Sequence, residues 1–338
     1  MKCLRPIAPL LLSAIATLAA EERSASWAFK PATRPTVPEV ARKDWSRTTI
    51  DRFILSKFEA SGLSPSPEAD RRSWLRRVTL DLTGVPPRPE EIDAFVKSRD
   101  PLAYEKAVDR LLASPQYGER WARHWLDTVH FAETHGYDKD RVRTNAWPYR
   151  DYVIRSFNAD KPYSLFIREQ LAGDMLFPGD TNAIIALGFI AAGPWDLVGH
   201  VELPESKMDG LIARYNDRDD MVMTTMGTFQ SLTVHCARCH DHKFDPISQE
   251  DYYRLQAVFA GVDRANRAYP LANGATGYVY AAAAKFSGEG DFKPSPAPRV
   301  VHRLIRGDVK RPGKPMEPGA LEAFADLREA FRVEDPDD

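Results

Sequence analysis

The sequence predicts a mainly α-helical protein, a multi-helix globular domain followed by a short irregular appendage that contains some β structure. Two patterns indicate helices: apolar residues recur every three or four positions through residues 50–259, and glycine or proline ends many of these segments. Strict alternation of apolar and polar residues, which is typical of a half-buried strand, is rare. The length of 338 residues is enough for one large core or two ordinary ones.

The predicted helices begin with three short segments that each have an apolar face and a clear stop. The first covers residues 50–58 and ends before Gly62, the second covers 74–82 and ends before Gly84, and the third covers 102–112 and ends before Pro115. Glycine adopts the left-handed conformation of a helix terminus, and proline lacks the backbone donor that a helix needs. We therefore expect three helices joined by ordered loops here.

Five further helices are predicted beyond residue 115. Their ranges are 117–133, 149–157, 164–171, 219–232 and 250–259. The first carries Trp121 and Trp125 at helical spacing, and the last precedes a rise in glycine and proline content. The clearest alternating segment lies at residues 300–305, so we expect a strand there.

Residues 1–20 differ from the rest of the chain and read as a signal peptide. Lys2 and Arg5 form a basic start, an apolar stretch covers residues 7–18, and two small residues follow it. The apolar stretch is shorter than the roughly 18 to 20 residues needed to cross a bilayer. We therefore expect cleavage rather than an uncleaved membrane anchor, and an exported protein, periplasmic or extracellular.

Composition divides the remaining chain into three parts. Residues 21–48 are rich in proline and predict an extended lead-in, residues 49–262 hold the predicted helices, and residues 263–338 form an appendage. No transmembrane segment is expected after signal cleavage, because no other stretch is long and apolar enough. The net charge is -2 with both signs interspersed, so binding to nucleic acid is not expected.

The run Cys236-Ala237-Arg238-Cys239-His240 carries the chemistry of this sequence. Two thiols three positions apart can add to the two vinyl groups of one porphyrin, and the following histidine can then ligate the iron. The spacing therefore predicts one covalent haem c, bound through Cys236 and Cys239, with His240 as the proximal iron ligand. The domain over residues 49–262 would then be cytochrome c-like.

Two other interpretations of the cysteine pair stay open. A thioredoxin-like redox pair would be expected in a strand–helix context that the patterns do not indicate, and a zinc site usually needs more thiols than this chain has. Signal cleavage would also remove Cys3, which leaves two thiols and excludes a disulfide framework.

Four separated blocks of sequence also carry a resemblance to a known family. They are Gly118-Glu119-Arg120-Trp121-Ala122-Arg123-His124-Trp125-Leu126-Asp127, Asn145-Ala146-Trp147-Pro148-Tyr149-Arg150-Asp151-Tyr152, Arg168-Glu169-Gln170-Leu171-Ala172-Gly173-Asp174 and residues 236–247. Over roughly residues 50–262 the chain resembles the planctomycete cytochrome c-like family, exported proteins of unknown function. The resemblance implies a haem and export, and it implies no particular reaction.

The chain departs from this family at both sides of the resemblance. Relatives often carry a further cytochrome-type domain before this one, and residues 20–50 hold none. They also usually continue into a second large domain. Residues 304–308 of this chain resemble the start of that domain. We expect residues 263–338 to be the start of a truncated C-terminal domain in a short form or split product. The expected partner is a redox protein, such as a separately encoded C-terminal domain protein.

The sixth iron ligand has two candidates in the sequence. His124 lies on a helix rich in aromatic residues, and Met221 lies on the helix that leads to the cysteine motif. We predict His124 as the distal ligand and keep Met221 as the runner-up, although each also fits an ordinary packing role. His242 is too close in sequence to reach the other face of the ring, so we expect it to hydrogen-bond locally.

The remaining polar residues give no catalytic assignment. Asp219 and Asp220 are adjacent and therefore face different sides of a helix, which argues against a paired-carboxylate site. We read residues 138–141 with Arg150 and Asp151 as a salt-bridged surface rather than an anion or carbohydrate site.

Three functions remain. One-electron transfer in the periplasm is favoured. The first alternative is a haem-dependent oxidoreductase acting on polysaccharide or another small substrate, and the second is a haem-stapled binding or structural module.

Overall fold

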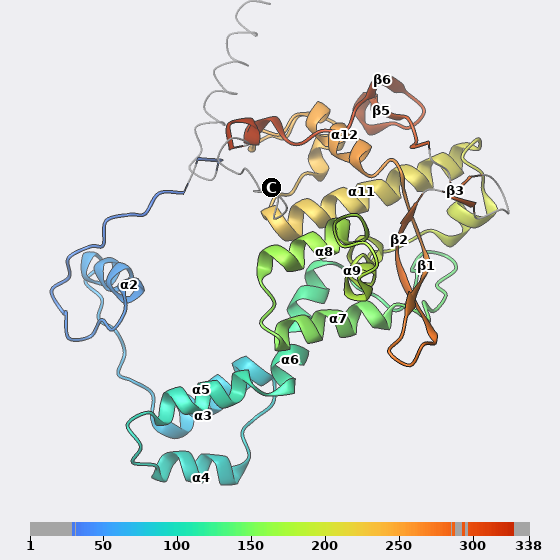
Figure 1. Ribbon diagram of the computed structural model, residues 1–338. Coiled ribbons are helices and arrows are strands. Elements are labelled where there is room, and N and C mark those ends of the chain that lie inside the picture. Colours follow the sequence, from blue (N-terminus) through green and yellow to red (C-terminus); the bar gives the residue numbers. More distant parts are fainter. Residues whose placement is uncertain (1–28, 31, 285, 288–292, 295–296, 328–338) are drawn as a thin grey trace, which may run out of the picture.

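A computed structural model describes residues 29–30, 32–284, 286–287, 293–294 and 297–327, and this part of the chain is about half helical (Figure 1). The predicted mainly α fold is confirmed. Eleven α-helices are described: α2 (Thr49–Ala60), α3 (Arg71–Thr83), α4 (Pro89–Lys97), α5 (Ala103–Leu112), α6 (Pro115–Thr128), α7 (Trp147–Asn158), α8 (Tyr163–Leu176), α9 (Thr181–Ala186), α10 (Gly188–Ala191), α11 (Met208–Gln230) and α12 (Gln249–Val258).

Short helical turns and strands complete the described chain. The turns are the π-helix η2 (Val198–Glu202) and the 3₁₀-helices η3 (His235–Arg238), η4 (Ile305–Gly307) and η5 (Glu322–Leu327). The strands form three antiparallel pairs: β1 (Val262–Pro270) with β2 (Thr276–Ala284), β3 (Phe286–Ser287) with β4 (Lys293–Pro294), and β5 (Val301–Leu304) with β6 (Pro312–Met316). The strand predicted at residues 300–305 is therefore confirmed as β5.

Several helices begin and end where local chemistry requires it. Thr48 and Asp51 form a capping box at the start of α2, and Ser248 and Asp251 form another at the start of α12. The predicted stop at Gly84 is confirmed, because this residue ends α3 with a left-handed φ of 73°.

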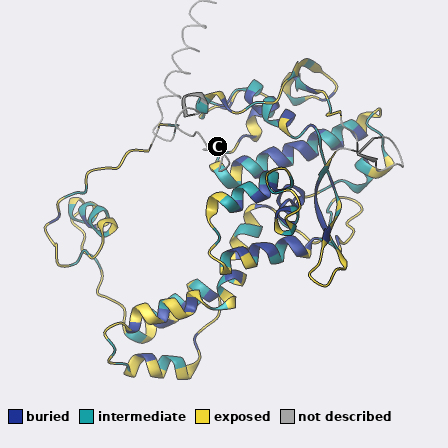
Figure 2. Cartoon of the chain, in the orientation of Figure 1, coloured by how far each residue is buried: buried dark blue, intermediate teal, exposed yellow. Residues whose placement is uncertain are grey.

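Two hydrophobic cores fill the main body, and α11 contributes to both (Figure 2). The central core joins α6–α11 to β1 and β2 and includes Tyr149, Tyr152, Phe166, Phe189, Met221, Val279 and Ala281. The C-terminal core joins α11, η3, α12 and β5 and includes Tyr215, Val222, Val234, Ala237, Tyr252, Tyr253, Val301 and Leu304. A third, smaller core around Leu75 and Phe95 holds α3–α5 together at the lower left of Figure 1.

The hairpin of β1 and β2 was not indicated by the sequence. It pairs over nine positions, from Val262 opposite Ala284 to Pro270 opposite Thr276. β1 contains the buried Arg264, and β2 ends in a run of alanines, so neither strand shows the apolar–polar alternation on which strand prediction depends. Tyr269, Val279 and Ala281 nevertheless pack in the central core.

Helix α11 is longer than the sequence indicates. It begins at Met208 rather than at residue 219, because the buried charges Asp217 and Arg218 interrupt the apolar pattern of its first half. Helix α6 ends at Thr128, before the predicted residue 133, and α4, α9 and α10 were not predicted.

Within the described part of the chain, none of the helices combines the length and apolar character needed to cross a membrane. Residues 1–20, predicted as a signal peptide, lie outside the described residues.

Candidate functional site

The cysteine motif forms a short exposed turn between α11 and α12. Cys236 and Cys239 are free thiols and both are exposed, whereas Ala237 between them is fully buried in the C-terminal core. This 3₁₀ turn therefore packs its alanine inward and presents both sulfur atoms to solvent. The structure thus brings the two predicted attachment residues together on one surface.

Arg238 fixes the turn to the helices beneath it. Its guanidinium donates to Asp219 Oδ2 at 3.0 Å and to Asn216 Oδ1 at 3.2 Å, both on α11. Its carbonyl accepts hydrogen bonds from the Tyr253 hydroxyl at 2.9 Å and from Gln249 Nε2 at 3.0 Å, both on α12. The middle residue of the motif, which sequence reasoning left unused, therefore anchors the motif.

Asp219 is the buried centre of this anchor. Besides Arg238 it accepts a hydrogen bond from the Tyr252 hydroxyl and lies 3.2 Å from His235 Nδ1. Burial raises the pKa of the Asp219 carboxyl, and the positive charge of Arg238 opposes that shift. The carboxylate is thus held by partners on η3 and α12 together.

His240 presents one ring nitrogen for ligation. Its Nδ1 lies 2.8 Å from the carbonyl oxygen of Asp241, and a carbonyl only accepts, so Nδ1 carries the proton. The lone pair is then on Nε2 of this exposed side chain. Metal-binding histidines commonly donate their other N–H to a backbone carbonyl in this way.

Gly307 in η4 packs closely against the second cysteine. Its φ is +73°, and a Cβ built on it would lie 2.6 Å from Cys239 Sγ and 3.3 Å from Arg238 Cγ. Only glycine lets the backbone pass this close to the thiol in this conformation. The segment around residue 307 therefore forms one wall of the turn.

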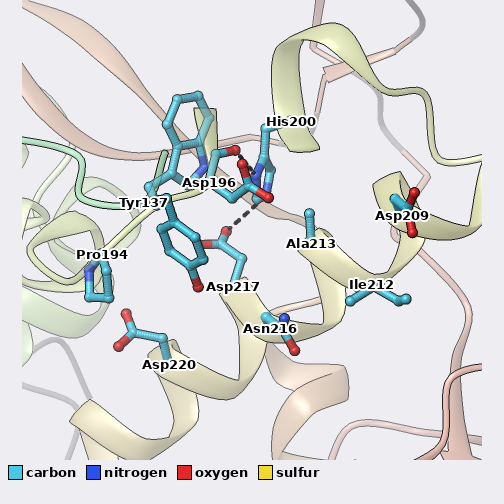
Figure 3. A pocket seen from close by; sticks show the side chains of 11 residues that line it. Tyr137, Pro194, Asp196, His200, Asp209, Ile212, Ala213, Asn216, Asp217 and Asp220 are labelled. Atoms are coloured by element: carbon cyan, nitrogen blue, oxygen red, sulfur yellow. Dashed lines mark hydrogen bonds and ion pairs between the residues drawn. The ribbon is translucent and has the colours of Figure 1, made fainter. Parts of the chain in front are cut away.

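A pocket opens beside the N-terminal half of α11 (Figure 3). Its cavity volume is about 170 Å³. Carboxylates line much of it, together with His200, Asn216 and two aromatic residues: the carboxylates are Asp196, Asp209, Asp217 and Asp220, and the aromatic residues are Tyr137 and Trp195. The sequence indicated no pocket here, because its residues come from three separate segments.

Three buried titratable groups lie at or beside this pocket: Arg264, Asp217 and His200. Arg264, 0% exposed, pairs through Nε with Asp217 at 2.8 Å and through its terminal nitrogen with Asp220 at 2.7 Å. Burial raises the pKa of Asp217, and Arg264 opposes that shift. Burial also lowers the pKa of His200 to about 4, so its imidazole is neutral at pH 7.

A comparison with known protein families identifies the family of this chain. Residues 49–264 match the family model PSCyt2, described as a protein of unknown function (DUF1549). The chain belongs to the PSCyt2 family. No curated protein and no solved structure matches it. The description assigns the family no function.

The two distal-ligand candidates lie in different surroundings in this PSCyt2 chain. His124 is exposed on α6, and its ring packs edge-on against Trp121 with centroids 5.6 Å apart. Met221 is 1% exposed in the central core, whereas the cysteine turn packs on the C-terminal core. Asp219, which contacts the turn, is separated from Met221 by about 200° around α11. Met221 could reach a haem only if the central core repacked, and the choice of distal ligand stays a prediction.

The other polar residues of the PSCyt2 domain behave as the sequence indicated. His242 accepts a hydrogen bond from the backbone N–H of Asp245 at 3.0 Å, which confirms a local role. Asp219 pairs with Arg238 and Asp220 pairs with Arg264, so the adjacent carboxylates do serve different sides of α11.

Three residues of the predicted salt-bridged surface, Lys139, Arg150 and Asp151, form ion pairs. Lys139 pairs with Glu202 of η2, and Arg150 pairs with Glu133 at 2.7 Å and with Asp151 at 3.0 Å. Among the residues that the structure describes, no three or more His, Cys, Asp or Glu side chains are grouped so that they could hold a metal ion.

Proposed function

We propose that this PSCyt2 protein is an exported c-type haem protein that transfers single electrons. The proposal rests on the turn at residues 236–240: two exposed free thiols at the required spacing are followed by a histidine whose Nε2 is available for iron. One haem would be attached to Cys236 and Cys239, with His240 as the proximal ligand.

The surroundings of the turn are compatible with a large planar group. Ile305 precedes Gly307 in the turn that packs on Cys239, and it is exposed. Phe244, four residues after His240, is 74% exposed. A bound haem would bring apolar surface that both side chains could cover. A zinc site usually needs more thiols than the two that this turn supplies, which weighs against the zinc interpretation.

Each residue of the turn has a separate role in this proposal. Haem supplies an iron centre that gains and loses one electron. Arg238 and Asp219 hold the turn against α11, so that both thiols face outward. The Asp241 carbonyl fixes the tautomer and direction of His240, which reduces the reorganisation that ligation would need. The exposed position of the turn would let a redox partner protein approach the haem edge, and a separately encoded C-terminal domain protein is one candidate.

Covalent attachment is the first test. The full chain is produced in a host with cytochrome c maturation, and denatured protein is stained on a gel for haem peroxidase activity. We expect staining in the wild type and none in Cys236→Ala/Cys239→Ala. His130→Asn changes an exposed histidine far from the motif in the sequence and is the matched control, which should retain staining. Extraction of all haem from the wild type by acidified organic solvent would contradict the proposal.

The optical spectrum separates electron transfer from catalysis. A low-spin, six-coordinate spectrum with a reversible one-electron reduction is expected for an electron carrier. Loss of that spectrum in His124→Ala, with retention in Met221→Ala, would support His124 as the distal ligand, and the reverse result would favour Met221. A high-spin, five-coordinate wild type would favour the haem-dependent oxidoreductase instead. Export is checked by mass spectrometry, which should find a mature N-terminus near Glu21.

A further inference from the structure

The pocket beside α11 contains a buried hydrogen-bond acceptor that has no partner. The His200 side chain is 7% exposed, and its Nδ1 lies 2.8 Å from the Asp196 carbonyl oxygen. A carbonyl only accepts, so Nδ1 carries the proton and Nε2 carries the lone pair. This Nε2 is buried and has no hydrogen-bond partner, and the His200 side chain lines the pocket. A buried acceptor of this kind normally has a donor nearby.

A carboxylate oxygen, itself an acceptor, lies near this nitrogen. Asp217 Oδ2 lies 3.8 Å from His200 Nε2, and Figure 3 shows the imidazole between Asp196 and Asp217. A separation of 3.8 Å is too long for a hydrogen bond. One donor nitrogen at about 2.9 Å from both atoms would satisfy them together.

The rest of the lining is also rich in acceptors and negative charge. Asp196, Asp209 and Asp220 add three carboxylates, whereas neither lysine nor arginine lines the pocket among the described residues. Arg264 neutralises part of this charge through its pairs with Asp217 and Asp220. The pocket surface therefore favours a ligand that is positively charged and donates hydrogen bonds.

The walls and size of the pocket limit the ligand further. Tyr137 and Trp195 supply aromatic surface, which attracts cations. Tyr137 is held over the pocket with a left-handed φ of 59°, on a loop that Lys139 ties to η2 by its ion pair with Glu202. The cavity volume of about 170 Å³ is below the ~300–1,000 Å³ typical of sites for drug-sized ligands.

We propose that this pocket binds a small organic cation that carries N–H donors, of the primary-ammonium class. The ammonium nitrogen lies between His200 Nε2 and Asp217 Oδ2, and its alkyl part lies against Tyr137 and Trp195. This site is separate from the cysteine turn and does not depend on the haem proposal.

Binding of 1,4-diaminobutane to the folded full chain tests the proposal by isothermal titration calorimetry at fixed ionic strength. We expect saturable binding with one site, and affinity about tenfold weaker in Asp217→Asn and in Asp209→Asn. Asp209 is exposed and outside the Arg264 pairs, so its variant decides the question if Asp217→Asn fails to fold. Asp81→Asn removes the same charge from the exposed surface of α3 and should bind like the wild type.

Three comparison compounds define the ligand class. Tetramethylammonium has the charge without N–H donors, 1,4-butanediol has the chain without charge, and calcium chloride supplies a divalent cation. Each is expected to bind at least tenfold more weakly than the diamine. Equal binding by any of them, or equal diamine affinity in the wild type and both pocket variants, would overturn the proposal.

Discussion

Helix α11 has two sides that differ in how their charged residues are arranged. One side holds Asp219, which pairs with Arg238 and anchors the exposed cysteine turn. The other holds Asp217 and Asp220, which pair with the fully buried Arg264 and line a pocket. On the first side the reactive groups point out and the structural charges point in. On the second side the charged groups themselves form the site.

Asn216 connects the two sides. Its side chain accepts a hydrogen bond from Arg238 and also lines the pocket. Residues 216, 217, 219 and 220 cover an arc of about 160° on the helix, so one short polar run reaches both places. The comparison teaches that neighbouring polar residues on one helix can contact two separate places when each residue has its own partner.

The largest expected loss of stability comes from removing the positive charge of Arg264, with which Asp217 and Asp220 both pair. Arg264→Met leaves Asp217 and Asp220 without their common cation in a buried position, which should lower the free energy of unfolding by about 3–5 kcal/mol. Urea unfolding followed by circular dichroism measures this. The double variant Arg264→Met/Asp217→Asn should recover part of the loss, and an additive further loss would contradict the pairing.

Removing the negative charge of Asp219, which anchors the cysteine turn, should lower the free energy of unfolding by a smaller amount. Asp219→Asn keeps the shape of the side chain but weakens its bonds to Arg238 and Tyr252, and we expect a loss of about 2–3 kcal/mol. The exposed Asp209→Asn is the control and should stay within about 0.5 kcal/mol of the wild type. A similar cost for both variants would show that Asp219 is not an anchor.

The free energy of unfolding should depend on pH because His200, which lines the pocket, takes up a proton on unfolding. Its pKa in the folded chain is about 4, below the 6.5 of an unperturbed imidazole, so the unfolded chain binds more protons between these values. The contribution of His200 is therefore present above pH 6.5 and is lost as pH falls, by about 2 kcal/mol between pH 7 and pH 5. Asp217, Arg214 and Arg264 surround this imidazole.

His200→Gln removes this titration and leaves the neighbouring charges in place. The variant should lose less stability than the wild type between pH 7 and pH 5, as measured by urea unfolding at both values. Because burial also lowers the pKa of His135 to about 4, some acid sensitivity should remain. Identical pH profiles in the two proteins would show that His200 is protonated equally in the folded and unfolded states.

The smallest expected effect is the difference between two glycine substitutions. This difference measures the cost of close packing at the cysteine turn apart from the cost of backbone conformation. Gly307→Ala and Gly274→Ala both place a side chain at positive φ, which costs about 1–2 kcal/mol. The added methyl group meets Cys239 Sγ only at residue 307, since nothing lies within 4 Å at residue 274. We expect Gly307→Ala to cost about 1 kcal/mol more and to change the rate at which Cys239 reacts with a thiol reagent. Equal costs and equal rates would contradict the packing of η4 on this thiol.

Local patterns predicted much of the helical framework. Apolar periodicity and glycine or proline stops gave α2, α3 and α5 close to their observed bounds, because these signals lie within one segment. The same method placed the start of α11 too late and missed β1 and β2. In both cases buried charges such as Asp217, Arg218 and Arg264 stand where the pattern expects apolar residues.

The sequence by itself determined the spacing of two thiols and a histidine at residues 236–240, because five consecutive residues carry that pattern. Only the tertiary structure revealed the anchor at Asp219, the close approach of Gly307, and the pocket around His200. The physical reason is that a buried charge is stabilised by partners from distant segments, here Arg264 of β1 and Asp217 of α11, and that the pocket is lined by three separate segments. Those partners become neighbours only when the chain folds.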